Sequence, residues 1–150
     1  MTPEPIFNAP SGVTGAIGVL VVTHVVLWHL LPEGMQLTAL SYLAFSPIRY
    51  TSRALDEGLF AWGAAVWTFA THMLVHGDIV HLIMNCAWLL VFGGAIAIRV
   101  GTQRFLALGI LSGIAGALAF LALRYGDPVP VVGASGAVSG LMGGAFRFFF

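Results

Sequence analysis

The sequence predicts an all-α membrane protein in which about four helices cross the bilayer. Of its 150 residues, 59% are apolar and only 8% are charged, whereas soluble domains carry roughly 25% charged residues. The few charges also avoid several stretches as long as a membrane-spanning helix, which needs about 20 apolar residues. A formal net charge of zero excludes the basic surface of a nucleic-acid-binding protein. The single cysteine excludes a disulfide framework and a cysteine-rich zinc site.

Four stretches are predicted to span the membrane after a short N-terminal tail, residues 1–12. The tail has no Lys or Arg and so lacks the basic region of a cleaved signal peptide. The predicted spans are residues 13–31, 80–98, 105–123 and a stretch that begins near Ala134. The long connection, residues 32–79, contains an apolar part, 58–77, that is rich in tryptophan and histidine. We expect this part to re-enter the membrane without crossing it.

The arginines predict the orientation. Arg99 and Arg104 bracket a very short loop between the second and third spans, and short arginine-bearing loops favour the cytoplasm. With four spans, this places the N-terminus inside and the starts of the second and fourth spans on the outer side. Arg49 and Arg53, in the long connection, argue for the opposite orientation.

The predicted orientation gathers polar side chains on the outer side. Five polar residues lead into or begin the second span: Thr71, His72, His76, His81 and Asn85. Ser135 begins the fourth span on the same side. His81 and Asn85 share a helix face, as His72 and His76 do if their segment is helical. Polar groups in a bilayer are costly, so they are usually functional or paired with a neighbour. A single histidine more often binds a neighbouring backbone group than performs chemistry, but five converging polar groups beside a glycine-flanked serine favour a site.

Ser135 has the local setting of a nucleophile. Gly133 and Gly136 flank it and remove side chains where a peptide carbonyl would approach the hydroxyl. A helix start also offers free N–H groups to a developing oxyanion. Ser135 is equally well interpreted as a packing residue, because Gly136, Gly140 and Gly144 recur every four residues, a pattern that lets helices approach closely. The third span carries a similar series, Gly109, Gly113 and Gly116.

Two separate motifs together resemble the rhomboid family of intramembrane serine proteases. They are WTFATHMLVHGDIVHLIMN at residues 67–85 and GASGAVSGLMG at 133–143, and the matching stretch, 67–144, is about half of the chain. The resemblance implies a rhomboid-like domain over 13–150, with about four helices of a six-helix core. It implies that substrates are transmembrane segments of other proteins, with the lipid bilayer as surroundings. It implies no nucleic acid, cofactor or metal, and we expect a bacterial inner membrane.

The resemblance also implies a role for each polar residue. Ser135 is the nucleophile of a serine–histidine dyad. His81 and Asn85 donate hydrogen bonds to the oxyanion. The supporting residues are His72, His76, Gly133 and Gly136.

The family's general base has no counterpart in this sequence. It is a histidine on the sixth core helix, in a His-x-x-Gly motif. None of the five histidines here, His24, His29, His72, His76 and His81, has a glycine three residues later. We favour the interpretation that the domain is truncated at its C-terminus and that this chain alone is inactive. An inactive relative that binds membrane helices, and a second-span histidine acting as base, remain open. So do a packing adaptor and a zinc or haem site made by the histidines.

Overall fold

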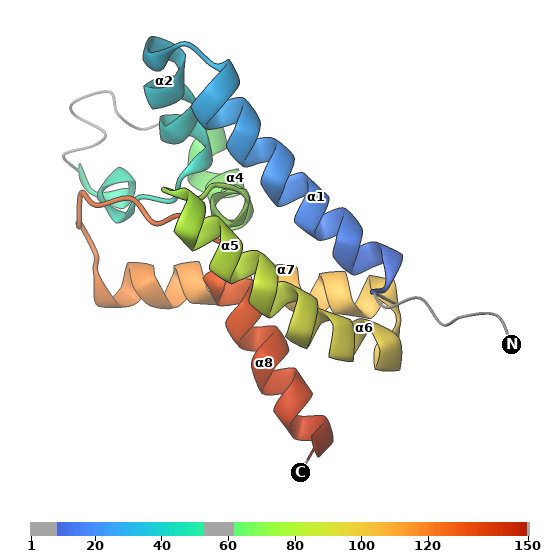
Figure 1. The fold of residues 1–150 in the computed structure, drawn as a ribbon. Helices are drawn as coiled ribbons and strands as arrows, with labels where there is room; N and C mark the ends of the chain where they lie inside the picture. The colour runs from blue at the N-terminus through green and yellow to red at the C-terminus, as the bar shows by residue number, and fades with distance from the viewer. Residues whose placement is uncertain (1–8, 53–61, 150) are drawn as a thin grey trace, which may run out of the picture.

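The computed structural model describes residues 9–52 and 62–149, and these form helices joined by short segments (Figure 1). Three of the helical rods are long and apolar enough to cross a membrane: Ser11–Leu30, Ile79–Val100 and Thr102–Leu123. They confirm the first three predicted spans to within three residues at each end. The fourth predicted stretch forms α8 (Ser135–Phe149), whose 15 residues are fewer than the roughly 20 of a full span. The described part of the chain therefore has three candidate spans, one fewer than predicted.

Two of the three spans contain a π-helical turn. α1 (Ser11–Val25) continues as a π-helical turn over Val26–Leu30. α5 (Ile79–Trp88) continues through a π-helical turn at Leu89–Gly93 into α6 (Gly94–Val100). Gly101 then ends α6 with a φ of 83°, a left-handed conformation that glycine adopts at little cost. α7 (Thr102–Leu123) begins at the next residue, so the predicted loop between the second and third spans is very short.

The two glycine series pack against each other where α7 meets α8. A Cβ atom on Gly136 would lie 3.3 Å from the Gly113 Cα, and one on Gly140 would lie 1.9 Å from the Ser112 Oγ. Larger side chains at these positions would hold the helices apart, so the glycines permit the close approach expected of small residues. This contact sets the angle at which α8 leaves the face of α7 (Figure 1).

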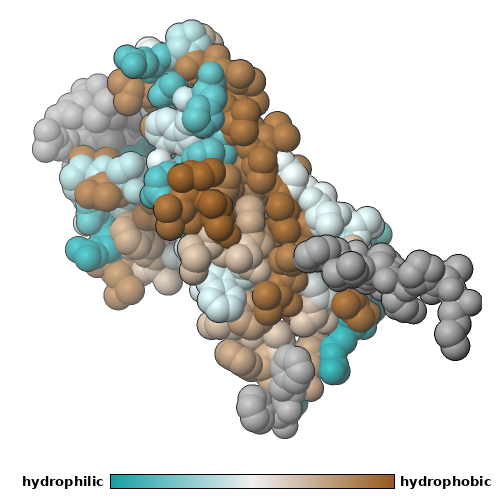
Figure 2. All heavy atoms as spheres, in the orientation of Figure 1, coloured by the Kyte–Doolittle hydropathy of each residue, from teal (hydrophilic) through white to brown (hydrophobic). Residues whose placement is uncertain are grey.

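The connection between the first two spans is partly helical. It contains α2 (Glu33–Leu43), a 3₁₀ turn at Pro47–Tyr50, α4 (Trp62–Thr71) and a second 3₁₀ turn at His72–Leu74. α4 packs against α7 and α2 packs against α4. Figure 2 shows apolar residues along α1 and hydrophilic residues at the end of the molecule that carries α2. Arg53 and residues 1–8 of the predicted tail lie outside the described residues, and the depth of the connection in a bilayer stays a prediction.

Arg49 holds this connection together from inside. Its side chain is buried, and its guanidinium donates to the Ala64 carbonyl oxygen (3.1 Å), the Thr68 Oγ1 (3.3 Å) and the Ser41 carbonyl oxygen (2.5 Å). The fixed fork of an arginine can bind several acceptors at once. Arg49 therefore links α2 and α4 through the 3₁₀ turn that lies between them in the chain.

Candidate active site

The segment that leads into α8 is held in place by backbone hydrogen bonds to the long connection. Phe45 and Val131 form an isolated antiparallel bridge, with N···O distances of 3.1 and 2.7 Å. The Gly133 N–H then donates to the carbonyl oxygen of His72 (2.9 Å). These bonds fix the path of the chain just before Ser135.

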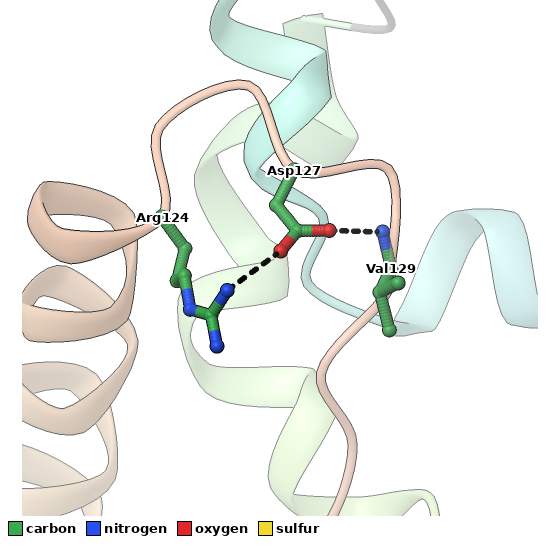
Figure 3. Close-up of polar contacts among 3 residues, drawn as sticks. All are labelled: Arg124, Asp127 and Val129. Carbon is green, nitrogen blue, oxygen red and sulfur yellow. Dashed lines mark hydrogen bonds and ion pairs between the residues drawn. The ribbon is translucent and has the colours of Figure 1, made fainter.

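The turn after α7 starts this path (Figure 3). Arg124 and Asp127 form an ion pair (3.8 Å), and the Asp127 carboxylate accepts a hydrogen bond from the Val129 N–H (2.9 Å). The Asp127 carbonyl oxygen also accepts from the Ile48 N–H (3.0 Å). An Asp that accepts from the backbone two residues later stabilises a tight turn, so this turn redirects the chain from α7 toward the Phe45–Val131 bridge.

Gly133 is required by the close approach of a histidine ring. Its φ is 110°, a conformation that other residues rarely adopt. A Cβ at this position would also lie 2.6 Å from Cε1 and 2.7 Å from Nε2 of His81. Glycine therefore lets the imidazole of His81 lie against the backbone two residues before Ser135.

Ser135 is the first residue of α8, as predicted, and its side chain is exposed. It lines a cavity of about 440 Å³ together with His81 and Asn85 of α5. The Val138 N–H donates to the Ala134 carbonyl oxygen (2.9 Å) and so makes the first α-helical hydrogen bond. The amides of Ser135 and Gly136 precede that bond and have no intrahelical acceptor. The cavity thus brings together a hydroxyl, two side-chain donors and the N-terminus of a helix.

His81 and Asn85 are placed by the first turn of α5. Asp78 caps this helix, because its carboxylate accepts from the His81 N–H (2.8 Å). The buried Asn85 donates from Nδ2 to the carbonyl oxygen of His81 (2.9 Å). An amide NH₂ has two donor protons, so one proton of Asn85 remains for another acceptor in the cavity.

His72 and His76 do not share a helix face, which corrects the conditional prediction. α4 ends at Thr71, His72 lies in the 3₁₀ turn, and His76 lies in the loop before α5. The His72 ring binds the Thr68 carbonyl oxygen through Nδ1 (3.0 Å), and burial lowers the pKa of His72. The helix gives way here because the chain must turn before Asp78 begins α5.

His76 is buried next to Ala134, the residue that precedes Ser135. Its Nε2 accepts a hydrogen bond from the Ala134 N–H (3.3 Å), and its ring lies 5.0 Å from that of His81. Burial, and next the charge of His81, lower the pKa of His76 to about 4. The imidazole is therefore neutral at pH 7, and its proton is on Nδ1 because Nε2 is the acceptor.

Trp28 is a positioning residue that the sequence analysis missed. Its indole N–H donates to the carbonyl oxygen of His76 (2.8 Å) and connects the π-helical turn after α1 to the loop before α5. A tryptophan near the end of a membrane span is a signal for an interfacial hydrogen bond, but its partner lies too far away in the sequence to be read from spacing.

All five histidines fall within the described residues, and none forms a hydrogen bond with the hydroxyl of Ser135 there. His24 is buried in α1, near the rings of Trp28 and His29. Across residues 9–52 and 62–149, no three His, Cys, Asp or Glu side chains form a group that could hold a metal ion. Nothing in this part of the chain therefore favours the zinc alternative.

The comparisons with known proteins point to one family. The family model "Rhomboid domain" matches residues 63–150. The chain is 34% identical over 90 residues to the mitochondrial RHOMBOID-like protein 6 of Arabidopsis thaliana, 35% over 90 residues to the rhomboid protease GluP of Bacillus subtilis, and 31% over 81 residues to the rhomboid protease GlpG of an Enterobacter species. These matches cover 54–60% of this chain and only 17–29% of the relatives. With its apolar helices and this domain match over more than half of its length, the chain is an integral membrane protein that belongs to the rhomboid family.

Proposed function

We propose that this chain supplies the nucleophile and the oxyanion donors of an intramembrane serine endopeptidase that cleaves transmembrane segments of other membrane proteins. The observation that supports it most is the shared cavity of Ser135, His81 and Asn85 at the start of α8. A serine hydroxyl at a helix N-terminus has amide donors beside it. Hydrolysis of a peptide bond by a serine nucleophile needs this combination of hydroxyl and donors.

In the proposed reaction, the Ser135 oxygen attacks the carbonyl carbon of the scissile peptide bond, and the carbonyl electron pair moves onto its oxygen. That oxyanion accepts hydrogen bonds from the Ser135 N–H, from the His81 ring and from the second amide proton of Asn85. Each preorganised donor of this kind is worth about 10²–10³ in rate. Asn85 is well suited because its bond to the His81 carbonyl oxygen already fixes the amide plane.

The proton of the Ser135 hydroxyl needs an acceptor, and we propose a histidine outside these 150 residues as the general base. His76 is an unsuitable base because its acceptor nitrogen already binds the Ala134 N–H. We propose supporting roles for His76 and His72, which hold the backbone of Ala134 and Gly133. We propose that Gly133 supports the site by leaving room for the His81 ring, and that Gly136 does so by letting α7 approach the start of α8.

We further propose that the protein resides in a bacterial inner membrane, with its N-terminus in the cytoplasm and the cavity near the outer surface. The short Arg99–Arg104 loop favours this orientation. We expect a tag at the N-terminus to be protected from added protease in intact spheroplasts and to be degraded in inverted vesicles. The opposite pattern would reverse the topology.

The test of the enzymatic proposal uses the natural gene product, expressed from its own locus, whose intact mass is measured first. Membranes that contain it are incubated with a reporter protein that has one transmembrane helix. We expect Ser135→Ala to reduce cleavage by at least about 10³-fold and to abolish labelling by a fluorophosphonate probe. Ser41→Ala is the matched control, because the hydroxyl of Ser41 binds only its own helix, at the Thr38 carbonyl oxygen (2.7 Å).

Two outcomes contradict the proposal. Cleavage that persists in Ser135→Ala removes the assigned nucleophile. A reporter that binds the unsubstituted protein but is never cut, with no fluorophosphonate labelling, assigns the chain to an inactive relative that binds membrane helices.

A further inference from the structure

The first candidate span reaches the candidate active site through one side chain, Trp28. Its indole N–H donates to the carbonyl oxygen of His76 over 2.8 Å. His76 lies between the 3₁₀ turn at His72–Leu74 and α5, outside the regular hydrogen bonding of a helix. The residue is buried, and a buried carbonyl needs a partner inside the protein. The indole is that partner, and it ties this loop to the Ser11–Leu30 span.

The shape of the helix around Trp28 is unusual. Trp28 lies in the π-helical turn Val26–Leu30, where the Leu31 N–H donates to the Val26 carbonyl oxygen, five residues back (3.0 Å). Such a turn holds about one residue more than an α-helical turn, so it changes the direction in which its side chains leave the helix. Single π-helical turns are rare and occur often at functional sites. The local shape of the span therefore belongs with the contact that Trp28 makes.

His76 carries the constraint from its backbone to the segment before α8. Its buried ring accepts the Ala134 N–H at Nε2 (3.3 Å) and lies 5.0 Å from the ring of His81. A histidine ring is separated from its Cα by two rotatable bonds with few preferred angles. A fixed backbone at His76 therefore restricts where the ring can meet Ala134.

Ala134 passes the constraint to Ser135. Its N–H is held by His76, and its carbonyl oxygen accepts from the Val138 N–H (2.9 Å). Because a peptide group is planar, the direction of the Ala134 carbonyl also sets the direction of the Ser135 N–H. That N–H is one of the proposed oxyanion donors. A shift of Ala134 would misdirect this donor and move the hydroxyl of Ser135.

We propose that Trp28 is a positioning residue for Ser135 and acts through His76 and Ala134. This inference rests on the proposed function, because the group that Trp28 positions is the proposed nucleophile. None of the described residues that line the Ser135 cavity comes from α1 or from its π-helical turn. Trp28 thus affects the rate at the serine without touching the substrate, and a misplacement of about 1 Å can cost about 10²-fold in rate.

The experiment compares two substitutions in membranes that contain the natural gene product. Trp28→Phe removes the indole donor to His76. Trp67→Phe is the matched control, because the Trp67 indole also donates to a backbone carbonyl oxygen, that of Tyr42 (2.7 Å), and there it joins α4 to α2. The rate of fluorophosphonate labelling of Ser135 is measured, together with kcat and KM for the transmembrane reporter. Correct folding is checked by the thiol reactivity of the partly buried Cys86.

We expect Trp28→Phe to lower the labelling rate and kcat by about tenfold or more, with little change in KM, whereas Trp67→Phe should stay within about twofold. Trp28→Gln keeps a side-chain N–H donor but loses the aromatic ring. It should be labelled faster than Trp28→Phe, which is the opposite order to that expected if Trp28 acts by packing alone.

The route through His76 is tested by combining substitutions. His76→Ala removes the ring that accepts the Ala134 N–H. In that background, Trp28→Phe should lower the labelling rate by less than about twofold more, because the ring that Trp28 positions is gone. A role independent of His76 predicts the same factor in both backgrounds.

The inference is overturned alone if the unsubstituted protein is labelled and the folded Trp28→Phe variant is labelled at the rate of Trp67→Phe. An equal effect of Trp28→Phe with and without the His76 ring, or slower labelling of Trp28→Gln than of Trp28→Phe, also overturns it. If the unsubstituted protein is never labelled, the proposed function fails and this inference fails with it.

Discussion

The substitution Gly140→Ala tests the contact between α7 and α8, on which the position of Ser135 depends. A Cβ atom at residue 140 would lie 1.9 Å from Oγ and 2.2 Å from Cβ of Ser112, whereas ordinary contact begins at 3.4 Å. Rotation of the Ser112 hydroxyl relieves the first clash only. The second involves an atom fixed to the backbone, so the helices must separate.

The magnitude follows from two opposing effects. Overpacking costs about 1–3 kcal/mol, and a clash with a rigid atom belongs at the upper end of that range. Replacing glycine by alanine in a helix returns about 1 kcal/mol of intrinsic helix stability. We therefore expect Gly140→Ala to lower the free energy of unfolding by about 2 kcal/mol.

The partner substitution makes this prediction specific. Ser112→Gly removes both clashing atoms and leaves the Ser112 Cα, 3.7 Å from the added methyl group, as the nearest atom. The double variant should recover most of the lost stability, which gives a coupling energy of about 2–3 kcal/mol between the two positions.

Unfolding is induced by SDS in mixed micelles and detected by the reaction of a fluorescent thiol reagent with the partly buried Cys86. The free energy of unfolding is measured in this way for the unsubstituted protein, the two single variants and the double variant. A coupling energy below about 0.5 kcal/mol, the usual error for independent sites, would refute the direct glycine–serine contact. It would also remove the basis for the angle of α8.

Three further predictions concern the elements that surround the site. The pKa of His76 is about 4 in the folded protein against 6.5 for a free histidine, so the unfolded state binds a proton first as the pH falls. Stability should be independent of this group above pH 6.5 and should decline by up to about 3 kcal/mol as the pH falls from 6.5 to 4; an equal decline in His76→Gln would contradict the assignment. Asp78→Ala removes the cap of α5 and should cost about 0.5–2 kcal/mol in the same unfolding assay, whereas Asp78→Asn should retain most of the stability. Arg49→Met removes the guanidinium from the Ser41 carbonyl oxygen and the Thr68 Oγ1, while the Ala64 carbonyl oxygen keeps its hydrogen bond from the Thr68 hydroxyl. This variant should cost roughly 2–4 kcal/mol; a loss within about 0.5 kcal/mol would show that these bonds contribute little.

The sequence predicts those parts of the fold that depend on local composition. Long stretches without charge locate the three candidate spans, because burial of charge in hydrocarbon is costly wherever it occurs. The glycine series predict that a helix can approach each of these two segments closely, but they do not predict that α7 and α8 are partners. The start of α8 at Ser135 was also predicted, since a serine among glycines breaks the apolar pattern of a span.

The parts that could not be predicted depend on where the chain turns. The spacing of His72 and His76 suits a helix face, but the segment must reverse before the cap at Asp78, and this requirement overrides the local spacing. The described residues hold three candidate spans, and the fourth predicted stretch forms α8, with 15 helical residues in the part that the structure describes; its crossing of the membrane stays a prediction. Roles for Ser135 and His81 remain predictions, as the geometry brings them together without testing their chemistry.

The Phe45–Val131 bridge has a consequence for how this protein tolerates change. The bridge and the Gly133–His72 bond join backbone atoms, so most side chains of the segment can vary without loss of the hydrogen bonds. A change in length is different. One residue inserted or deleted between Val131 and Ser135 shifts the donor that meets His76 and rotates the serine away from the cavity. We therefore expect this segment to accept substitutions outside Gly133 and Ser135 and to reject single-residue insertions and deletions.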